Sequence, residues 1–249
     1  MNELTVQYRF KLENQPDEIF NLKIDPRTLS LQDNKPESLP EWARLEFYQC
    51  PNCPLISSRF PYCPLASNLV NIVSRFNRFL SYDRIEVEIV SQERIISNFT
   101  TAQRGLRSLM GLIIAVSDCP HTVFFKPMAR FHLPFSDEIE TIYRATSMYL
   151  LAQYFIKKSK GKPDFKLKGL TRIYHNLHLV NTSIAHRLRK ASQTDSTVNA
   201  IVLLDIFTKA LPKAIEESLK EIQYLFTPFL EKTKKKGLFF KRKKSNKIS

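Results

Sequence analysis

Four cysteines form the clearest chemical pattern in the sequence, because a proline follows each of them. They are Cys50, Cys53, Cys63 and Cys119. Proline fixes its own φ angle and disfavours the helical region for the residue before it, so each Cys-Pro pair should hold its thiol on a stiff, extended loop. A C-x-x-C pair, a third cysteine nearby and a distant fourth can supply the four soft ligands of a tetrahedral zinc site. We therefore expect a structural zinc site.

Other uses of these thiols stay open. His121 follows Cys119 by two residues and could replace one cysteine as a metal ligand. An iron–sulfur cluster is the second choice of metal group, because its ligand sequences also contain Cys-Pro. Such a cluster, or reactive thiols, would make the protein a redox or signalling sensor. Without any metal, the cysteines would be free thiols packed as small apolar groups.

The last 18 residues form a strongly basic tail. The chain has a net charge of +14, and from residue 232 onward there are nine basic residues and no acidic one, which leaves the body only mildly basic. Cations mixed with a Leu-Phe-Phe group are typical of a segment that binds an anionic membrane surface. Nucleic acid is the alternative partner, since cations neutralise phosphates and Phe rings stack on bases, and a tail that only solubilises is the third interpretation. The residues expected to bind the anionic surface are Lys234, Lys235, Lys236, Phe239, Phe240, Lys241, Arg242, Lys243 and Lys244.

Signatures of the common enzyme classes are missing from the sequence. The chain has only five glycines and no G-x-G-x-x-G or P-loop pattern. It also lacks the H-E-x-x-H pattern of a catalytic zinc and the G-x-S-x-G turn of a serine hydrolase. The sequence thus gives no support for an enzyme, although an enzyme acting on an anionic substrate near the histidines of the C-terminal half stays open.

Three of these histidines lie on one side of a predicted helix. At 100° per residue, His175, His178 and His186 fall opposite the apolar stripe of residues 167–190. This pattern favours a solvated polar face, with an anion-binding or partner-binding face as the alternative. His132 has apolar neighbours in the sequence, which favours a histidine satisfied inside the core or at its rim.

Hydrophobic periodicity predicts an α+β protein, with antiparallel hairpins and two helices in a mixed N-terminal half and an all-helical C-terminal half. Alternating apolar residues predict strands, paired as two hairpins, at 5–13 with 19–24 and at 84–89 with 94–99. Apolar residues at intervals of three and four predict helices at 65–80, 100–117, 137–158, 167–190 and 200–229, the last interrupted at Pro212. Residues 122–131 are predicted to be extended.

The chain divides by composition and pattern into three regions. Residues 1–135 form the mixed region that contains the cysteines, 136–230 the helical region and 231–249 a basic tail predicted to be disordered. The start of the chain lacks the basic and apolar stretches of a secretory signal, and apolar windows such as 109–116 are too short to span a membrane. We expect a cytoplasmic protein whose tail associates peripherally with the inner membrane surface.

Three short motifs carry a resemblance to a known family. They begin at Cys50 (Cys-Pro-Asn-Cys-Pro-Leu), Tyr62 (Tyr-Cys-Pro-Leu-Ala) and Arg130 (Arg-Phe-His-Leu-Pro-Phe). With them the chain resembles an uncharacterised bacterial family of unknown function over most of its length before the tail. The resemblance implies a bacterial cytosolic setting but no activity and no site residue.

Taken together, these patterns predict a non-enzymatic protein with a cysteine-built zinc site and a polybasic tail that docks on an anionic surface. A thiol or iron–sulfur redox sensor is one alternative. A nucleic-acid-binding accessory protein is the other.

Overall fold

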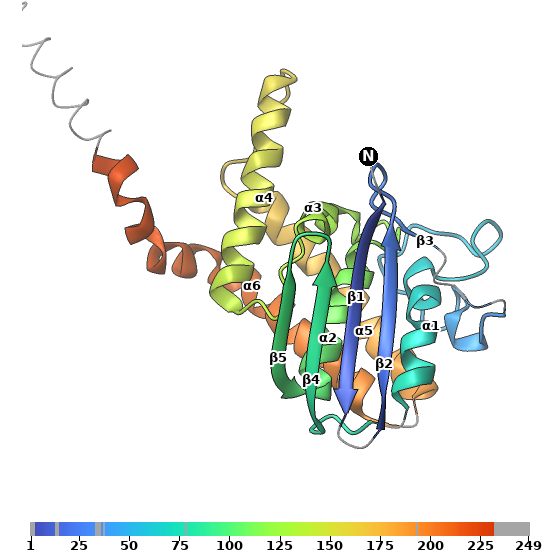
Figure 1. Cartoon of the computed structure of the whole chain (residues 1–249). Helices are drawn as coiled ribbons and strands as arrows, with labels where there is room; N and C mark the ends of the chain where they lie inside the picture. The colour runs from blue at the N-terminus through green and yellow to red at the C-terminus, as the bar shows by residue number, and fades with distance from the viewer. Residues whose placement is uncertain are drawn as a thin grey trace, which may run out of the picture.

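Five antiparallel strands form one sheet in the described part of the N-terminal half (Figure 1). The computed structural model describes residues 3–12, 15–32, 36, 38–77, 79–192 and 194–231, without the side chains of 12, 15, 207 and 209–218. The strands in spatial order are β3 (Leu31–Gln32), β2 (Gln15–Ile24), β1 (Leu4–Leu12), β4 (Arg84–Ser91) and β5 (Ile95–Thr101). The two predicted hairpins are therefore confirmed as β1–β2 and β4–β5, and β1 joins them by pairing with β4.

Strand β1 has an apolar face toward the core and a charged face away from it. Val6, Tyr8 and Phe10 are buried, as expected for alternate residues of a strand with one face in the core. On the opposite face, Arg9 Nη1 lies 3.4 Å from a carboxylate oxygen of Glu88 on β4. Partly exposed ion pairs of this kind add little stability, so the apolar inner face is what fixes the register of the sheet.

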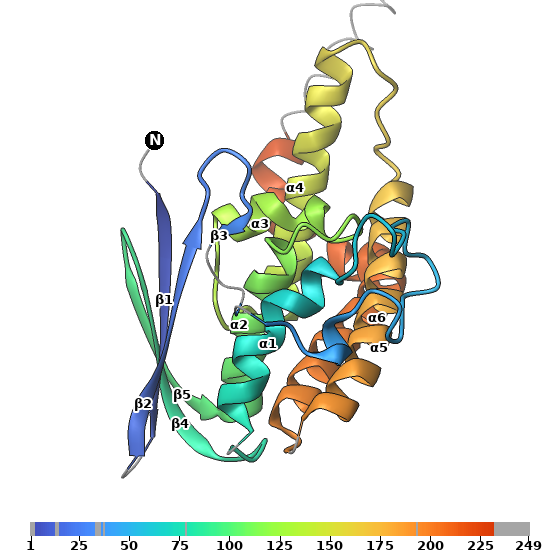
Figure 2. The ribbon, with the colours of Figure 1, turned by 90° about the vertical axis from the view of Figure 1, so that its right-hand side faces the viewer.

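Helices cover the inner face of the sheet in two successive layers (Figure 2). The first layer is α1 (Pro64–Phe76) with α2 (Ala102–Ala115), and the second is α5 (Lys168–Ala191) with α6 (Ser196–Glu221). Phe76 at the end of α1 packs edge-on against Phe10 of β1, with ring centroids 4.8 Å apart. Because α2 also packs against α6, one hydrophobic core runs from the sheet to the C-terminal helices.

The connection between α2 and the C-terminal helices is helical. Residues 122–131 contain the short helices η2 (Val123–Phe125) and α3 (Lys126–Arg130), so the prediction of an extended segment is wrong. Pro127 lies in the first turn of α3. At that position the missing N–H of proline costs no hydrogen bond and its fixed φ angle suits a helix.

Helix α4 (Glu138–Lys158) begins where the sequence predicts and projects beyond the body of the protein (Figure 1). The Asp137 side chain accepts a hydrogen bond from the Glu140 N–H at 2.8 Å, and the Glu140 side chain accepts one from the Asp137 N–H at 2.9 Å. This reciprocal capping box satisfies two N–H groups that would otherwise lack a partner at the helix start.

Helix α6 runs through Pro212 without the predicted interruption. Proline removes one hydrogen bond inside a helix. The packing of α6 against α2 and α5 offsets this loss, since most of a helix's stability in a protein comes from tertiary packing.

The fold is α+β, as predicted from the sequence. Two short helices complete the described chain: η1 (Glu41–Ala43) between β3 and α1, and η3 (Gln223–Phe226) after α6. No strand is found in the described part of the C-terminal half. Among the described helices, none combines the length and the apolar composition needed to cross a membrane.

Candidate functional site

All four cysteines lie in irregular backbone next to helices. Cys50 and Cys53 lie between η1 and α1, Cys63 immediately precedes α1, and Cys119 follows α2. The backbone of Cys63 has φ −69° and ψ 119°, the extended conformation that a following proline favours, and Pro64 opens the helix. The Cys53 N–H donates to the Cys50 carbonyl at 3.0 Å, which closes the C-x-x-C segment as a turn.

His121 connects two of the cysteine loops. Its Nε2–H donates to the carbonyl oxygen of Asn52, between Cys50 and Cys53, at 2.7 Å. The Asn52 side chain donates in turn to Asn176 Oδ1 on α5 at 3.2 Å. The predicted ligand His121 is thus a bridge between the loops in this structure, because its Nε2 is engaged by the carbonyl.

A buried arginine accompanies the cysteines. Arg187 on α5 is 1% exposed, and its guanidinium donates to the carbonyl oxygens of Trp42, Arg44 and Leu45 at 2.8, 2.6 and 2.8 Å. Within the described part of the chain, no carboxylate forms an ion pair with it, and its Nε has no hydrogen-bond partner. No carboxylate of the described residues therefore neutralises this cation.

Arg187 was not among the residues predicted from the sequence, although one signal pointed to it. It follows Ile184 by three residues and Val180 by seven, so it belongs to the apolar stripe of α5. A cation on the buried face of an amphipathic helix indicates a special environment, because Arg is almost never fully buried unless it is paired.

Burial controls the protonation of Cys119. It raises the pKa of this thiol to about 12, although the backbone N–H groups of His121 and Thr122 donate to the sulfur and partly oppose the shift. The nearby thiols of Cys63 and Cys50 add to the rise. At neutral pH the side chain is a neutral thiol that faces two N–H donors.

Burial and neighbouring groups also shift the pKa of Cys50. Burial raises its pKa, and the Ser183 hydroxyl on α5 opposes this by donating to the sulfur, while Cys63 and Cys53 add smaller increases. Burial likewise lowers the pKa of the Arg187 guanidinium, and the surrounding thiols oppose that change. These effects show that the Arg187 guanidinium lies within electrostatic reach of Cys50, Cys53 and Cys63.

The side chains do not have the arrangement of a coordination site. Among the described residues, no group of three or more His, Cys, Asp or Glu side chains is placed to hold a metal ion. The structure places Cys50, Cys53 and Cys63 within electrostatic reach of Arg187, and Cys119 within reach of Cys50 and Cys63, without showing a metal centre.

The three histidines of α5 have different surroundings. His178 Nδ1 lies 2.7 Å from the carboxylate of Asp205 on α6. The ring of His186 stacks on Tyr48 with centroids 5.6 Å apart, and His175 is exposed. The prediction of a solvated face holds for His175 and His186, which are both exposed, whereas His178 is only partly exposed because α6 packs over that part of the helix.

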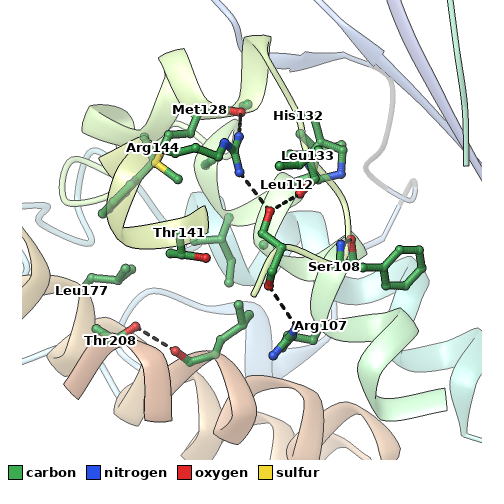
Figure 3. Close-up of a pocket in the computed structure, with 18 of the residues that line it drawn as sticks. Arg107, Ser108, Leu112, Met128, His132, Leu133, Thr141, Arg144, Leu177 and Thr208 are labelled. Carbon is green, nitrogen blue, oxygen red and sulfur yellow. Dashed lines mark hydrogen bonds between the residues drawn. The ribbon is translucent and has the colours of Figure 1, made fainter. Parts of the chain in front are cut away.

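A cavity of about 190 Å³ lies between α2, α4, α5 and α6, beside the segment that contains α3 (Figure 3). Leu112, Leu133 and Leu177 contribute to its mainly apolar wall, and the side chains of Arg107 and Arg144 also line it. The site residues predicted from the sequence lie elsewhere. The cavity could not be predicted from the sequence, because its wall combines residues from five separate segments.

The residues predicted to bind an anionic surface, from Lys234 to Lys244, lie outside the residues that the structure describes. The described chain ends at Glu231, directly before the basic stretch.

The chain matches one of the family models with which it was compared. The family, described as "Domain of unknown function (DUF6901)", matches residues 6–227. No curated protein and no solved structure matches the chain.

Proposed function

Since the chain belongs to the family of unknown function DUF6901, whose description gives no activity, we propose a function from the chain's own residues. The four cysteines Cys50, Cys53, Cys63 and Cys119 bind one zinc ion, and the role of this ion is structural rather than catalytic. The zinc ties the loop before α1 to the loop after α2, beside α5.

The observation that carries this proposal is the buried guanidinium of Arg187. A buried cation without an opposite charge is costly, and three carbonyl groups supply hydrogen bonds but no net charge. Zinc bound to four thiolates carries a net negative charge, so a zinc centre here would supply the missing counterion. The Ser183 hydroxyl lowers the pKa of Cys50, and the N–H groups of His121 and Thr122 lower that of Cys119; groups placed in this way could act as outer groups around a metal centre.

The raised pKa values of Cys50 and Cys119 argue against reactive thiols. A redox-sensing cysteine needs a lowered pKa, because the thiolate is the reactive form. A metal ion instead displaces the thiol proton when it binds, so a buried, neutral thiol in the free protein is compatible with a ligand.

Metal analysis of the full chain, purified without air, tests the proposal. We expect about one zinc per chain, no visible colour, and intense thiolate-to-metal absorption after replacement by cobalt(II). A brown protein that contains iron and sulfide would overturn zinc in favour of an iron–sulfur redox centre. Protein without metal, whose four thiols all react after unfolding, would leave the cysteines as packed apolar groups.

Single substitutions identify the ligands. Cys50→Ser and Cys119→Ser should each abolish stoichiometric zinc binding, whereas the control His178→Gln should retain it. If His121 acts only as an outer group, His121→Gln should weaken zinc binding about 10- to 100-fold. Complete loss in this variant would instead make His121 a ligand in place of a cysteine.

We also propose that the C-terminal segment docks on an anionic membrane surface. Tyr224, Leu225 and Phe229 are 71%, 54% and 72% exposed, and the basic stretch begins at Lys232, three residues after Phe229. Exposed aromatic and aliphatic side chains next to cations are typical of segments that lie in the membrane interface. The protein would then be peripheral at the inner membrane surface, with the lysines and arginines of the tail close to anionic lipid headgroups.

Vesicle sedimentation tests this second proposal. The full chain should bind vesicles that contain phosphatidylglycerol and should release them in high salt. It should not bind neutral phosphatidylcholine vesicles. Deletion of residues 232–249 should abolish binding, and Phe229→Ser should weaken it without changing the fold. Unchanged binding after the deletion, or tighter binding to single-stranded nucleic acid than to vesicles, would contradict the proposal.

A further inference from the structure

The outer end of α4 exposes large apolar side chains to solvent. Leu151, Tyr154 and Phe155 are 55%, 50% and 56% exposed. They follow one another at intervals of three and four residues, so they share one face of the helix. Phe165, in the segment that returns from α4 to α5, is 57% exposed. Helix α4 projects beyond the body of the protein at this end (Figure 1), which leaves these side chains in contact with solvent.

Lysines surround these apolar side chains. Residues 151–168, which we call the α4 tip, contain six lysines and one acidic residue, Asp164, so six positive charges less one negative charge leave +5. Lys158 Nζ lies 5.8 Å from the centroid of the Tyr154 ring, which places a cation beside an aromatic ring of the apolar face. The exposed lysines of the α4 tip are Lys157, Lys158, Lys160, Lys162, Lys166 and Lys168.

Hydrogen bonds of Asp164 join the returning segment 159–167 to α4. The carboxylate accepts from the Tyr149 hydroxyl on α4 at 3.0 Å and from the Gly169 N–H in the first turn of α5 at 2.7 Å. The backbone N–H of Asp164 donates to the buried Gln153 side chain at 2.8 Å. The apolar and basic side chains of the α4 tip are therefore carried by a folded element rather than by a free loop.

A tight turn ends α4 and carries a further cation. The Gly161 N–H donates to the Ile156 carbonyl at 2.9 Å, and Lys160 has a φ angle of 64°. A residue in the left-handed conformation commonly ends a helix in this way, and it is usually a glycine. A lysine occupies the position here, so Lys157, Lys158 and Lys160 all lie at the outermost turn.

An apolar face among lysines matches an anionic lipid surface better than it matches a protein or a nucleic acid. Lysine is depleted from protein–protein interfaces. In a membrane interface, its carbon chain lies along apolar groups while its ammonium group stays among the headgroups. A nucleic acid would suit the lysines and the rings of Tyr154 and Phe155 but would leave the aliphatic Leu151 and Ile156 without a matching contact.

We propose that the α4 tip inserts into the interface of an anionic membrane. The side chains of Leu151, Tyr154 and Phe155 enter the boundary between headgroups and acyl chains, and the lysines contact anionic headgroups. This inference rests on the proposed docking of the C-terminal segment. The tail, with nine basic residues and no acidic one, supplies most of the attraction, and the α4 tip enters the interface once the tail has docked. Two separate contacts then fix the orientation of the body on the membrane.

Brominated acyl chains, which quench tryptophan fluorescence inside a bilayer, test the insertion directly. The chain has a single tryptophan, Trp42, so Phe155→Trp is made in the full chain together with Trp42→Phe. Vesicles of phosphatidylglycerol with brominated phosphatidylcholine should quench the introduced tryptophan, because an apolar face in the interface lies about 5–10 Å deep. The control Tyr82→Trp, in the same background, should not be quenched. Tyr82 is 66% exposed and precedes β4, whose start lies at the end of the molecule away from the outer end of α4 (Figure 1).

Vesicle sedimentation of the same variants separates the two proposals. Binding to the vesicles without quenching in Phe155→Trp would overturn the insertion of the α4 tip and leave the docking of the tail. Equal quenching in Phe155→Trp and in the control Tyr82→Trp would also overturn it. No binding to phosphatidylglycerol vesicles at all would overturn both proposals.

Affinity measurements test the contribution of the apolar face. Phe155→Ser should weaken the binding of the full chain to phosphatidylglycerol vesicles on the order of tenfold, because one large side chain no longer leaves water. The control Phe99→Ser, which removes an 80% exposed ring from β5, should keep the natural affinity. Circular dichroism checks that both variants are folded. Natural affinity in folded Phe155→Ser would overturn the proposal.

Sedimentation velocity without lipid distinguishes a membrane from a protein as the partner of the α4 tip. The natural full chain should sediment as a monomer, and Phe155→Ser should not change its sedimentation coefficient. A dimer that dissociates in Phe155→Ser would make the α4 tip an interface between two copies of the chain and overturn the proposal. Binding to single-stranded nucleic acid that is tighter than binding to vesicles and is lost in Phe155→Ser would overturn it as well.

Discussion

At Arg187, three backbone carbonyl groups from one short segment take the place of the acidic partner that a buried cation usually has. The carbonyls belong to Trp42, Arg44 and Leu45, which directly follow or belong to η1. The arginine therefore fixes the segment that leads into the cysteine loop on the surface of α5. Its contribution is both structural, through these hydrogen bonds, and electrostatic, through the thiols around it.

Replacement of Arg187 by methionine should lower the free energy of unfolding by about 3 kcal/mol or more, because three buried carbonyls lose their donors. Urea unfolding followed by the fluorescence of Trp42 measures this change. Arg189→Met, an exposed neighbour on the same helix, is the matched control and should change stability by less than about 0.5 kcal/mol. A loss of under about 1 kcal/mol in Arg187→Met would show that water replaces the guanidinium.

A second residue with a defined protonation state is His132. Its pKa of about 3 in the folded protein lies below the unperturbed value of about 6.5. The neutral imidazole accepts from Tyr8, whose own pKa is raised by burial and whose hydroxyl also lies 2.9 Å from Ser108 Oγ. Between these two pH values the unfolded chain binds a proton that the folded protein excludes.

The stability linked to His132 should be complete above about pH 6.5 and decrease as the pH falls through that value. The slope approaches about 1.4 kcal/mol per pH unit for one proton. Urea unfolding from pH 7.5 to pH 5 should therefore show a shallower pH dependence in His132→Gln than in the natural protein. His175→Gln, which alters an exposed histidine, should leave the slope unchanged; an identical slope in both variants would contradict the assignment.

At the scale of elements, α2 connects the two layers, because it packs against both the sheet and the C-terminal helices. One side of it packs on β4 and the other on α6. Gly105 allows the close approach to the sheet, because a Cβ at this position would lie 2.8 Å from Val87 Cγ2 and 2.9 Å from Phe10 Cε1. Gly111, nearly two turns later, meets no such obstacle.

The same substitution at the two glycines should therefore have opposite effects. Gly105→Ala should destabilise the protein by about 1–3 kcal/mol, because the added methyl overpacks the interface with the sheet. Gly111→Ala should stabilise it by up to about 1 kcal/mol, since alanine favours a helix over glycine. Thermal unfolding of both variants measures the difference in stability. If the unfolding temperature moves in the same direction in both variants, helix propensity rather than contact with the sheet determines the effect.

At the scale of the whole molecule, the mixed and helical halves share one hydrophobic core. Buried residues of the sheet, of α2 and of α5 belong to a single cluster. The cysteine neighbourhood and the cavity both depend on α5, which supplies Arg187 to the first and Asn181 to the second. The C-terminal half thus completes sites that begin in the N-terminal half.

The sequence by itself determined the local structure wherever one short stretch contains all the relevant residues. The alternation in β1 placed Val6 and Tyr8 in the core, the Asp137 capping box marked the start of α4, and Cys63-Pro64 set the start of α1. Each of these features depends on interactions between residues at most a few positions apart. The α+β class followed from the same local periodicities.

Tertiary structure alone decided the features that depend on distant partners. Arg187 lies 142 to 145 residues from the carbonyls that it contacts, and the cavity joins side chains from five segments. The helical form of residues 122–131 and the continuity of α6 through Pro212 likewise follow from packing, which outweighs weak local preferences. A hydrophobic pattern shows which face of an element is buried, but the groups that meet there are set by how the layers pack.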